Sequence, residues 1–235
     1  MLRTANAPVE AGAPAKASAP AGRRAEARPA AVPRWKRGLD LAAGLLALAA
    51  LSPVMLAAAA AVRLTSPGPV LFRQTRIGLN ERPFTMLKFR TMYVDADHTA
   101  QNALNLRELR GEAVAEDGLF RLVNDPRITP VGQVLRRYSI DELPQLLNLL
   151  RGEMSLVGPR PAVPWEVELF TPEQRRRHVL PPGLTGLWQV SGRNRLSMQQ
   201  MLDLDLAYVE RCTLRRDLAI LLRTPAAVLL DHATR

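Results

Sequence analysis

The 235 residues suit one folded domain with a tail, and a formal net charge of +10 indicates an anionic partner: nucleic acid, anionic lipid or a phosphorylated substrate. A single cysteine, Cys212, excludes an intramolecular disulfide and fits a reducing compartment. The three histidines lack metal-ligand spacing such as H-E-x-x-H, which argues against a zinc site.

Residues 1–33 are rich in alanine and proline, with scattered arginines. Such a segment offers little apolar area to offset the conformational entropy of ordering, so we expect a disordered tail. It does not resemble a signal peptide, because the apolar region begins too far into the chain.

Residues 38–62 are almost entirely apolar, apart from Asp40 near the start and Ser52-Pro53 inside. About 20 apolar residues can span a bilayer as a helix, so a transmembrane helix is one interpretation. However, basic residues flank both ends, which favours the cytoplasmic side for both. Pro53 also removes a backbone donor, and the longer arm would reach only about 22 Å of a ~30 Å core. We therefore predict a re-entrant helix-break-helix over residues 34–66, with its membrane bend at Ser52 and Pro53.

The next segments are shorter. Pro67-Gly68-Pro69 is typical of a turn, and residues 70–73 and 84–92 are predicted to be short strands. In the second strand, alternation puts Lys88 and Arg90 on one face, which is either a solvated basic edge or a phosphate-binding surface. Residues 95–116 are polar and predicted to be helical.

A short helix over residues 131–138 leads to two adjacent acids, Asp141 and Glu142, and a Leu-rich helical run follows. Carboxylates beside fixed cations suit phosphate chemistry. One carboxylate can attack phosphorus while the other holds Mg²⁺, or both can bind the metal.

The structural alternative is a capping box in which Ser139 and Glu142 start a helix. Pro144 weakens it, because as the fifth helical residue its missing N–H would break the hydrogen-bond ladder. We therefore predict that the acid pair lies at a helix start or a kink, where backbone donors are exposed to anions.

Downstream, the prolines on both sides of Arg160 restrict its backbone. Its guanidinium suits a phosphate or nucleotide, with a structural salt bridge as the alternative. A short helix over residues 172–180 carries Arg175, Arg176 and Arg177, which we expect to face water or lipid headgroups. Residues 186–194 are predicted to form a loop whose backbone can come close to a ligand. An amphipathic helix over 197–208 and an apolar helix over 214–230, interrupted near Pro225, complete the chain.

Residues 138–161, YSIDELPQLLNLLRGEMSLVGPRP, resemble the catalytic block of the bacterial sugar transferases, the monotopic polyprenyl-phosphate phosphoglycosyl transferases. The resemblance continues as PGPVLFRQTRIG at 67–78, KFRTM at 88–92 and PGLTGLWQVSGRN at 182–194, and covers about residues 34–230. These motifs are long and specific.

The resemblance implies transfer of a sugar-1-phosphate, with glucose or galactose as the expected hexose, from a UDP-sugar to undecaprenyl phosphate, releasing UMP. This would be the first membrane step of exopolysaccharide, capsule or O-antigen synthesis. It also implies that Asp141 forms a covalent phosphosugar intermediate and that Glu142 is the chief Mg²⁺ ligand. Arg136, Arg160 and Arg193 would bind phosphate and nucleotide-sugar, with Lys88 and Arg90 as further candidates.

We therefore predict a mainly α fold with short β-strands. Its parts are the tail (1–33), the re-entrant membrane helix (34–66) and a cytoplasmic catalytic region (67–235). We expect the protein at the bacterial inner membrane, with membrane lipid as a partner. A homodimer is possible. The alternative is a non-catalytic membrane-anchored interaction protein, in which Asp141 and Glu142 would be dispensable. A nucleic-acid-binding protein is not expected, because no binding motif is recognisable and only 5% of residues are aromatic.

Overall fold

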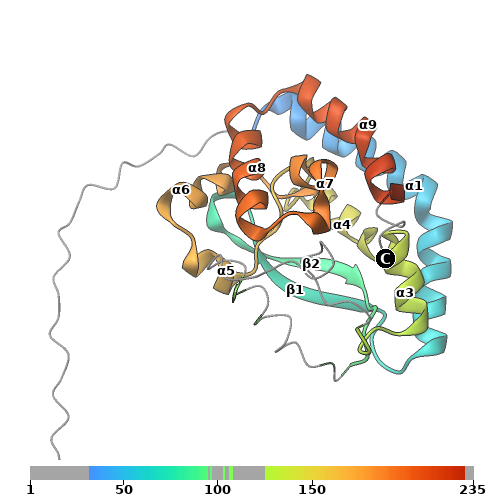
Figure 1. Cartoon of the computed structure of the whole chain (residues 1–235). Helices are drawn as coiled ribbons and strands as arrows, with labels where there is room; N and C mark the ends of the chain where they lie inside the picture. Colours follow the sequence, from blue (N-terminus) through green and yellow to red (C-terminus); the bar gives the residue numbers. More distant parts are fainter. Residues whose placement is uncertain (1–31, 95, 97–102, 104–105, 108–124, 231–235) are drawn as a thin grey trace, which may run out of the picture.

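The computed structural model describes residues 32–94, 96, 103, 106–107 and 125–230 (Figure 1). Nearly all of the predicted tail and most of the predicted helix at 95–116 lie outside the described residues. The described part is mainly helical with short strands, which confirms the predicted fold class. Its elements are α1 (Arg34–Thr65), β1 (Leu71–Ile77), η1 (Leu79–Glu81), β2 (Pro83–Phe89), α3 (Pro130–Arg137), η2 (Ile140–Glu142), α4 (Gln145–Arg151), β3 (Ser155–Val157), α5 (Pro164–Leu169), α6 (Pro172–Arg175), η3 (Arg176–Val179), β4 (Gly183–Thr185), α7 (Leu187–Ser191), η4 (Arg193–Arg195), α8 (Met198–Glu210) and α9 (Leu214–Leu230).

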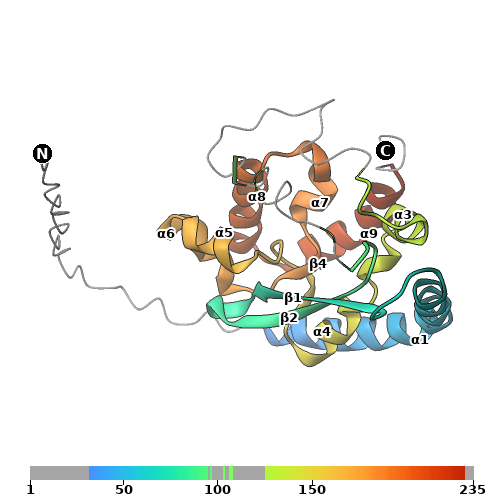
Figure 2. The same cartoon turned by 90° about the horizontal axis from the view of Figure 1, so that it is seen from below.

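The long helix α1 is bent into two arms (Figures 1 and 2). Pro53 lies inside this one helix, so the expected break is a bend and not an interruption. Proline has no N–H to donate to the carbonyl four residues earlier, which is that of Ala49. The Ser52 hydroxyl donates to this carbonyl instead, at 2.9 Å. The Ser-Pro pair therefore bends the helix while keeping the affected backbone acceptor hydrogen-bonded.

A buried polar cluster joins the first arm of α1 to α8 and α9. The Lys36 ammonium donates to Asp217 at 2.6 Å and to the Tyr208 hydroxyl at 3.0 Å. The same hydroxyl donates to the other Asp217 oxygen at 2.7 Å. All three side chains are buried, so each charge depends on the others for compensation.

Two further polar contacts hold this arm against α4 and β3. The Arg37 guanidinium donates to two carbonyls at the end of α4, each at 2.7 Å. Asp40 accepts from the Ser155 hydroxyl at 2.9 Å and from the Leu156 N–H at 2.8 Å. Gly44 lies directly against α4, where an added Cβ would meet a leucine side chain at 2.3 Å. The first arm is therefore fixed to α4 and β3.

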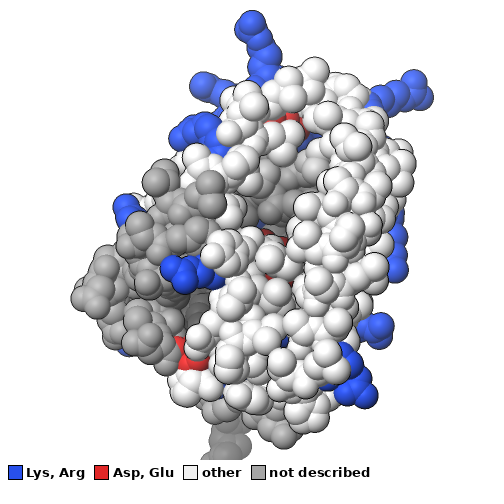
Figure 3. Space-filling model, turned by 90° about the vertical axis from the view of Figure 1, so that its right-hand side faces the viewer, with Lys and Arg blue, Asp and Glu red and all other residues white. Residues whose placement is uncertain are grey.

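The second arm of α1 packs against a different part of the same region. Ala58 and Val62 form a core cluster with Phe89 at the end of β2 and Leu135 of α3. The outward side of α1 remains apolar and exposed, as at Leu56. Figure 3 looks onto the side of the molecule that carries this arm, where the surface is mostly uncharged with Lys and Arg at its edge. Among the described residues, α1 is the one helix long and apolar enough to cross a membrane by length and composition.

The strands form two separate pairs. β1 and β2 are antiparallel, with Gln74 opposite Met86 and Arg76 opposite Phe84. Both predicted strands are present, but β1 extends further than expected and β2 ends at Phe89, so that Arg90, predicted to share a strand face with Lys88, lies outside the strand. β3 and β4 form a short parallel pair that the sequence did not reveal.

The C-terminal part differs from expectation in two places. The predicted loop over 186–194 is wrong, because most of it forms α7 and the start of η4. The interruption predicted near Pro225 is also wrong, since α9 runs through this residue. One face of α9 packs on the core through Ile220, while Leu222 is exposed. The predicted amphipathic helix is confirmed as α8, which Ser197 caps by accepting from the Gln200 N–H.

Candidate active site

The acid pair lies in η2, a single turn between α3 and α4. Ser139, before the turn, is in the left-handed region (φ 54°) and makes no side-chain cap, so the capping box does not form. Pro144 immediately precedes α4, where its missing N–H breaks no helical hydrogen bond. The predicted kink at the acid pair is therefore confirmed, and Asp141 and Glu142 lie away from a regular helical face.

The two acids differ in their ionisation. Burial raises the pKa of Asp141 to about 6, and the charge of the adjacent Glu142 adds to this effect. Burial also opposes ionisation of Glu142. However, the Lys88 ammonium, 2.8 Å from the Glu142 carboxylate, together with the charges of Arg193 and Arg76, holds its pKa below the usual value. The two carboxyl groups therefore differ in pKa, with Asp141 the more basic of the two, and such a difference is typical of catalytic carboxylates.

The structure brings Lys88 to the acid pair but takes Arg90 elsewhere. Arg90 is buried and donates to the backbone carbonyl and hydroxyl of Ser66, each at 2.8 Å, and to the carbonyl of Pro67. It therefore holds the turn that follows α1. Although they are only two positions apart in the chain, Lys88 and Arg90 contact different parts of the molecule.

Arg136 and Arg193 both act electrostatically on the acid pair. Arg136 donates to the Thr91 hydroxyl at 2.9 Å, and its positive charge lowers the pKa of Asp141. Arg193 donates to the Ser139 hydroxyl at 3.1 Å and lowers the pKa of Glu142. Both cations are therefore placed to act on anions bound at this turn.

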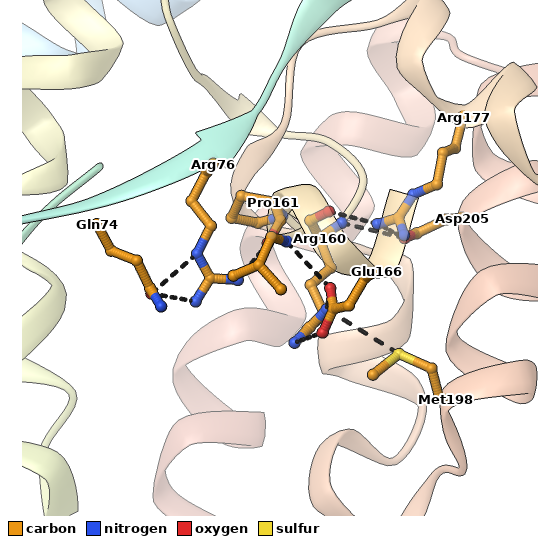
Figure 4. Close-up of polar contacts among 9 residues, drawn as sticks. Gln74, Arg76, Arg160, Pro161, Glu166, Arg177, Met198 and Asp205 are labelled. Carbon is orange, nitrogen blue, oxygen red and sulfur yellow. Dashed lines mark hydrogen bonds and ion pairs between the residues drawn. The ribbon is translucent and has the colours of Figure 1, made fainter. Parts of the chain in front are cut away.

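Arg160 lies in a second charged cluster (Figure 4). Its guanidinium donates to both oxygens of the fully buried Glu166, at 2.8 and 3.2 Å. Its backbone N–H donates to Asp205 at 3.1 Å, and its carbonyl accepts from Arg177. The structural salt bridge considered above is therefore present, yet 19% of the Arg160 side chain remains accessible. The backbone of Arg160 is held at both its N–H and its carbonyl.

The expectation that Arg175, Arg176 and Arg177 all face water or headgroups is wrong for Arg177. Arg176 is largely exposed, but only 1% of the Arg177 side chain is accessible. Arg177 is buried because Asp205 of α8 lies 2.5 Å away and compensates its charge. Burial in turn raises the pKa of Asp205 to about 6.

Arg76 was not singled out from the sequence, although it lies in a motif that carried the family resemblance. This half-buried residue of β1 donates to Gln74 through Nε and Nη2, at 3.1 and 2.6 Å, and to the carbonyl of Pro161 at 2.8 Å. Burial and then the charge of Arg160 lower its pKa to about 10, while Glu142 acts in the opposite direction. Arg76 therefore connects the acid pair electrostatically with the Arg160 cluster.

The acid pair offers carboxylate oxygens to a divalent cation. The described residues contain no group of three or more His, Cys, Asp or Glu that could hold a metal ion. Mg²⁺ at phosphoryl-transfer sites is commonly bound by one or two carboxylates together with substrate phosphates and water. The repulsion that raises the pKa of Asp141 is also what a cation relieves. Asp141 and Glu142 therefore fit a partial Mg²⁺ site that substrate phosphates would complete.

Comparison with known proteins agrees with this arrangement. The family model described as "Bacterial sugar transferase" matches residues 32–231. The exopolysaccharide production protein ExoY of Rhizobium meliloti is 43% identical over 200 residues, covering 85% of this chain and 87% of ExoY. The UDP-glucose:undecaprenyl-phosphate glucose-1-phosphate transferase of Caulobacter vibrioides is 44% identical over 212 residues, covering 86% and 73%. The undecaprenyl-phosphate galactose phosphotransferase of Salmonella typhimurium is 39% identical over 194 residues, covering 83% and 40%.

The family match covers α1, the acid pair, and the arginines described above, including Arg136, Arg160 and Arg193. It also includes the turn that carries the two adjacent carboxylates, Asp141 and Glu142. This chain therefore belongs to the bacterial sugar transferase family.

Proposed function

We propose that this enzyme transfers a hexose-1-phosphate from a UDP-sugar to undecaprenyl phosphate, in the synthesis of a bacterial polysaccharide. The observation that carries the proposal is the acid pair in the turn before α4, where Asp141 is buried, the Glu142 carboxylate lies 2.8 Å from the Lys88 ammonium, and the charges of Arg136 and Arg193 act on the pair. The names of two relatives specify undecaprenyl phosphate, and one of them specifies UDP-glucose. Glucose and galactose both occur in the names, so the hexose stays open between them.

In the first step, an Asp141 oxygen attacks the sugar-linked phosphorus of the donor. A bond forms between this oxygen and phosphorus, and the bond from phosphorus to the bridging oxygen breaks. UMP leaves with the bridging oxygen and its electron pair, and the sugar phosphate remains on Asp141 as an acyl phosphate. We assign Arg136 and Arg193 to the charge that develops at this turn, because their charges already act on Asp141 and Glu142, and we assign Arg160 to the nucleotide end of the donor.

In the second step, a phosphate oxygen of undecaprenyl phosphate attacks the same phosphorus. The bond to Asp141 breaks, the carboxylate is regenerated, and the sugar is left on undecaprenyl diphosphate. Mg²⁺ held chiefly by Glu142 would supply neutralisation of the phosphate charges in both steps.

Asp141 suits the nucleophile better than Glu142 for an electrostatic reason. Glu142 is ion-paired with Lys88, which reduces the electron density available for attack. Asp141 is more basic, because burial and the charge of Glu142 raise its pKa. Once ionised, it can form the new bond to phosphorus while Glu142 retains its charge for the metal.

We further propose that α1 is re-entrant and that the catalytic region lies on the cytoplasmic side of the inner membrane. A straight 32-residue helix would be about 48 Å long, which would separate its ends by more than a bilayer core. The two arms instead pack on one region, the first through Arg37 and Asp40 and the second through Ala58 and Val62. This geometry supports an active site at headgroup level, where a soluble donor meets a lipid-linked phosphate.

A trapping experiment tests the proposed chemistry. Detergent-solubilised protein with Mg²⁺ and UDP-glucose or UDP-galactose, but without undecaprenyl phosphate, should release UMP and gain the mass of one hexose phosphate on Asp141. Asp141→Asn should abolish both signals, whereas Glu142→Gln should slow both half-reactions and weaken their dependence on Mg²⁺. An adduct mapped to Glu142 would reverse the assignment of roles. Full transfer by the Asp141→Asn protein would instead favour the non-catalytic alternative for the acid pair.

A further inference from the structure

The guanidinium of Arg76 is held in a fixed position by neutral groups. Gln74 accepts two of its hydrogen bonds, and the carbonyl of Pro161 accepts a third. Figure 4 shows Arg76 between these two residues, with Arg160 and Glu166 beyond Pro161. An arginine side chain has five N–H donors, so donors remain for a ligand. Its planar fork is therefore oriented before any ligand arrives.

The charge of Arg76 is not compensated by a close carboxylate. Among the residues that the structure describes, no acid lies within the 4.0 Å ion-pair distance of its guanidinium. The acids that influence it are already paired, Glu166 with Arg160 and Glu142 with Lys88. Arg160 adds a second positive charge nearby, which makes protonated Arg76 less favourable. A half-buried guanidinium in this situation gains from an incoming anion.

From this geometry we infer that Arg76 is a substrate-binding residue that holds the nucleoside-side phosphate of the donor, an inference that rests on the proposed function. The sugar-linked phosphate must reach Asp141 for the reaction to occur. The second phosphate of the diphosphate is then only one bridging oxygen away, and Arg76 is near enough to Glu142 for the two charges to interact, so we assign this phosphate to Arg76. In this inference Gln74 is a positioning residue, because it accepts two hydrogen bonds from the guanidinium and thereby orients it.

The most direct test adds a negative charge beside the Arg76 guanidinium without changing the shape of the neighbouring side chain. Gln74→Glu keeps the length of the side chain and both acceptor contacts, but it places a carboxylate on Arg76 and neutralises it. Thr75→Glu is the matched control, because it adds the same charge one residue away, at an exposed position on the opposite face of β1. The probe is UMP, which carries the nucleoside-side phosphate, and its affinity is measured by calorimetry on detergent-solubilised protein with Mg²⁺.

We expect UMP to bind about tenfold or more weakly to Gln74→Glu, the effect of losing one charge-assisted contact. Its affinity for Thr75→Glu should stay within about twofold of wild type, since an exposed charge is screened. Gln74→Glu should melt no lower than Thr75→Glu, because it creates an ion pair with Arg76. Equal UMP affinity of the two variants would overturn the inference and return Arg76 to a structural clamp on Pro161.

The same preparation separates this inference from the proposed function. If wild-type protein releases no UMP from either UDP-sugar, the proposed reaction fails, while the comparison of UMP affinities still decides the role of Arg76. If wild-type protein releases UMP but both variants bind it as tightly as wild type, the reaction stands and the assignment of Arg76 falls.

Arg76→Lys provides a second check, because lysine keeps the charge but cannot reproduce the fork held by Gln74 and Pro161. It should also weaken UMP binding, and wild-type affinity in this variant would contradict an oriented guanidinium.

Discussion

Replacing Asp141 with asparagine should stabilise the fold while abolishing activity. Burial and the charge of Glu142 both disfavour the Asp141 carboxylate, and they raise its pKa from 3.8 to about 6. At about 1.36 kcal/mol for each pKa unit, this difference corresponds to about 3 kcal/mol of unfavourable free energy at neutral pH. Asparagine keeps the shape of the side chain and removes the charge, so the Asp141→Asn protein should recover most of this free energy.

The sign of the effect depends on pH. Because the pKa of Asp141 is raised in the folded protein, its favourable contribution is fully present below the unfolded value of 3.8 and is lost as pH rises through about 6. Wild-type protein should therefore lose stability relative to Asp141→Asn between about pH 4 and pH 7. For a domain of this size, about 3 kcal/mol corresponds to roughly 6–12 °C in melting temperature.

Thermal unfolding in one detergent, at pH 4.5 and pH 7.5, measures this directly. The advantage of Asp141→Asn should be small at the lower pH and should approach its full size at the higher pH. Glu142→Gln is the control with the opposite sign, because Glu142 is ion-paired with Lys88 and its pKa is lowered. This variant should be less stable than wild type at pH 7.5. An Asp141→Asn protein that melts no higher than wild type at pH 7.5, or gains equally at both pH values, would refute the reasoning.

Two further predictions concern pH dependence and topology. The kcat/KM for UMP release should fall about tenfold per pH unit below the Asp141 pKa of about 6. In Glu142→Gln this fall should begin at a lower pH, because the charge of Glu142 raises the pKa of Asp141. A kcat/KM that stays constant from pH 7 to pH 5 would contradict an ionised Asp141 nucleophile. For topology, cysteines are introduced at two exposed positions, as Arg34→Cys and Thr65→Cys, in a Cys212→Ser background. Both should react with a membrane-impermeant maleimide only after the inner membrane is opened. Labelling of only one of the two sites in intact spheroplasts would establish that α1 spans the membrane.

The parts of the fold that could be predicted depend on local chemistry. Pro53 bends α1 through its own missing N–H, and Ser197 caps α8 through its own hydroxyl. Pro144 likewise excludes a regular helix through the acid pair. Each of these features is decided within a few residues, so the sequence pattern is sufficient to find it.

The parts that could not be predicted depend on partners distant in the chain. Arg177 sits in a run of arginines that is typical of an exposed surface, and it is buried only because Asp205 comes from another helix. The 186–194 segment contains two glycines, which favoured a loop, but α7 forms where Leu187 and Val190 pack against the C-terminal core. Periodicity contains no information about these contacts.

The residues of the candidate site also fall into those that the sequence indicated and those that it did not. The family motifs pointed to Asp141, Glu142 and several arginines as candidates, and the structure places Lys88 against Glu142. Motifs did not reveal that Arg90 holds the turn at Ser66, or that Gln74 fixes Arg76. Arg76 could have been noticed as a basic residue inside the RQTRIG motif, two positions from a residue able to orient it.

The buried cluster around Lys36 also constrains the order of events during synthesis. Lys36 is made early, but its partners Tyr208 and Asp217 follow 172 and 181 residues later. At about 5–20 residues per second, a ribosome needs roughly 10–35 s to reach Asp217. Throughout this interval the membrane helix has a lysine whose buried partners do not yet exist. Docking of α1 onto α9 is therefore a late event, and a ribosome that stalls before Asp217 leaves a nascent chain with an unpaired lysine at the base of its membrane helix.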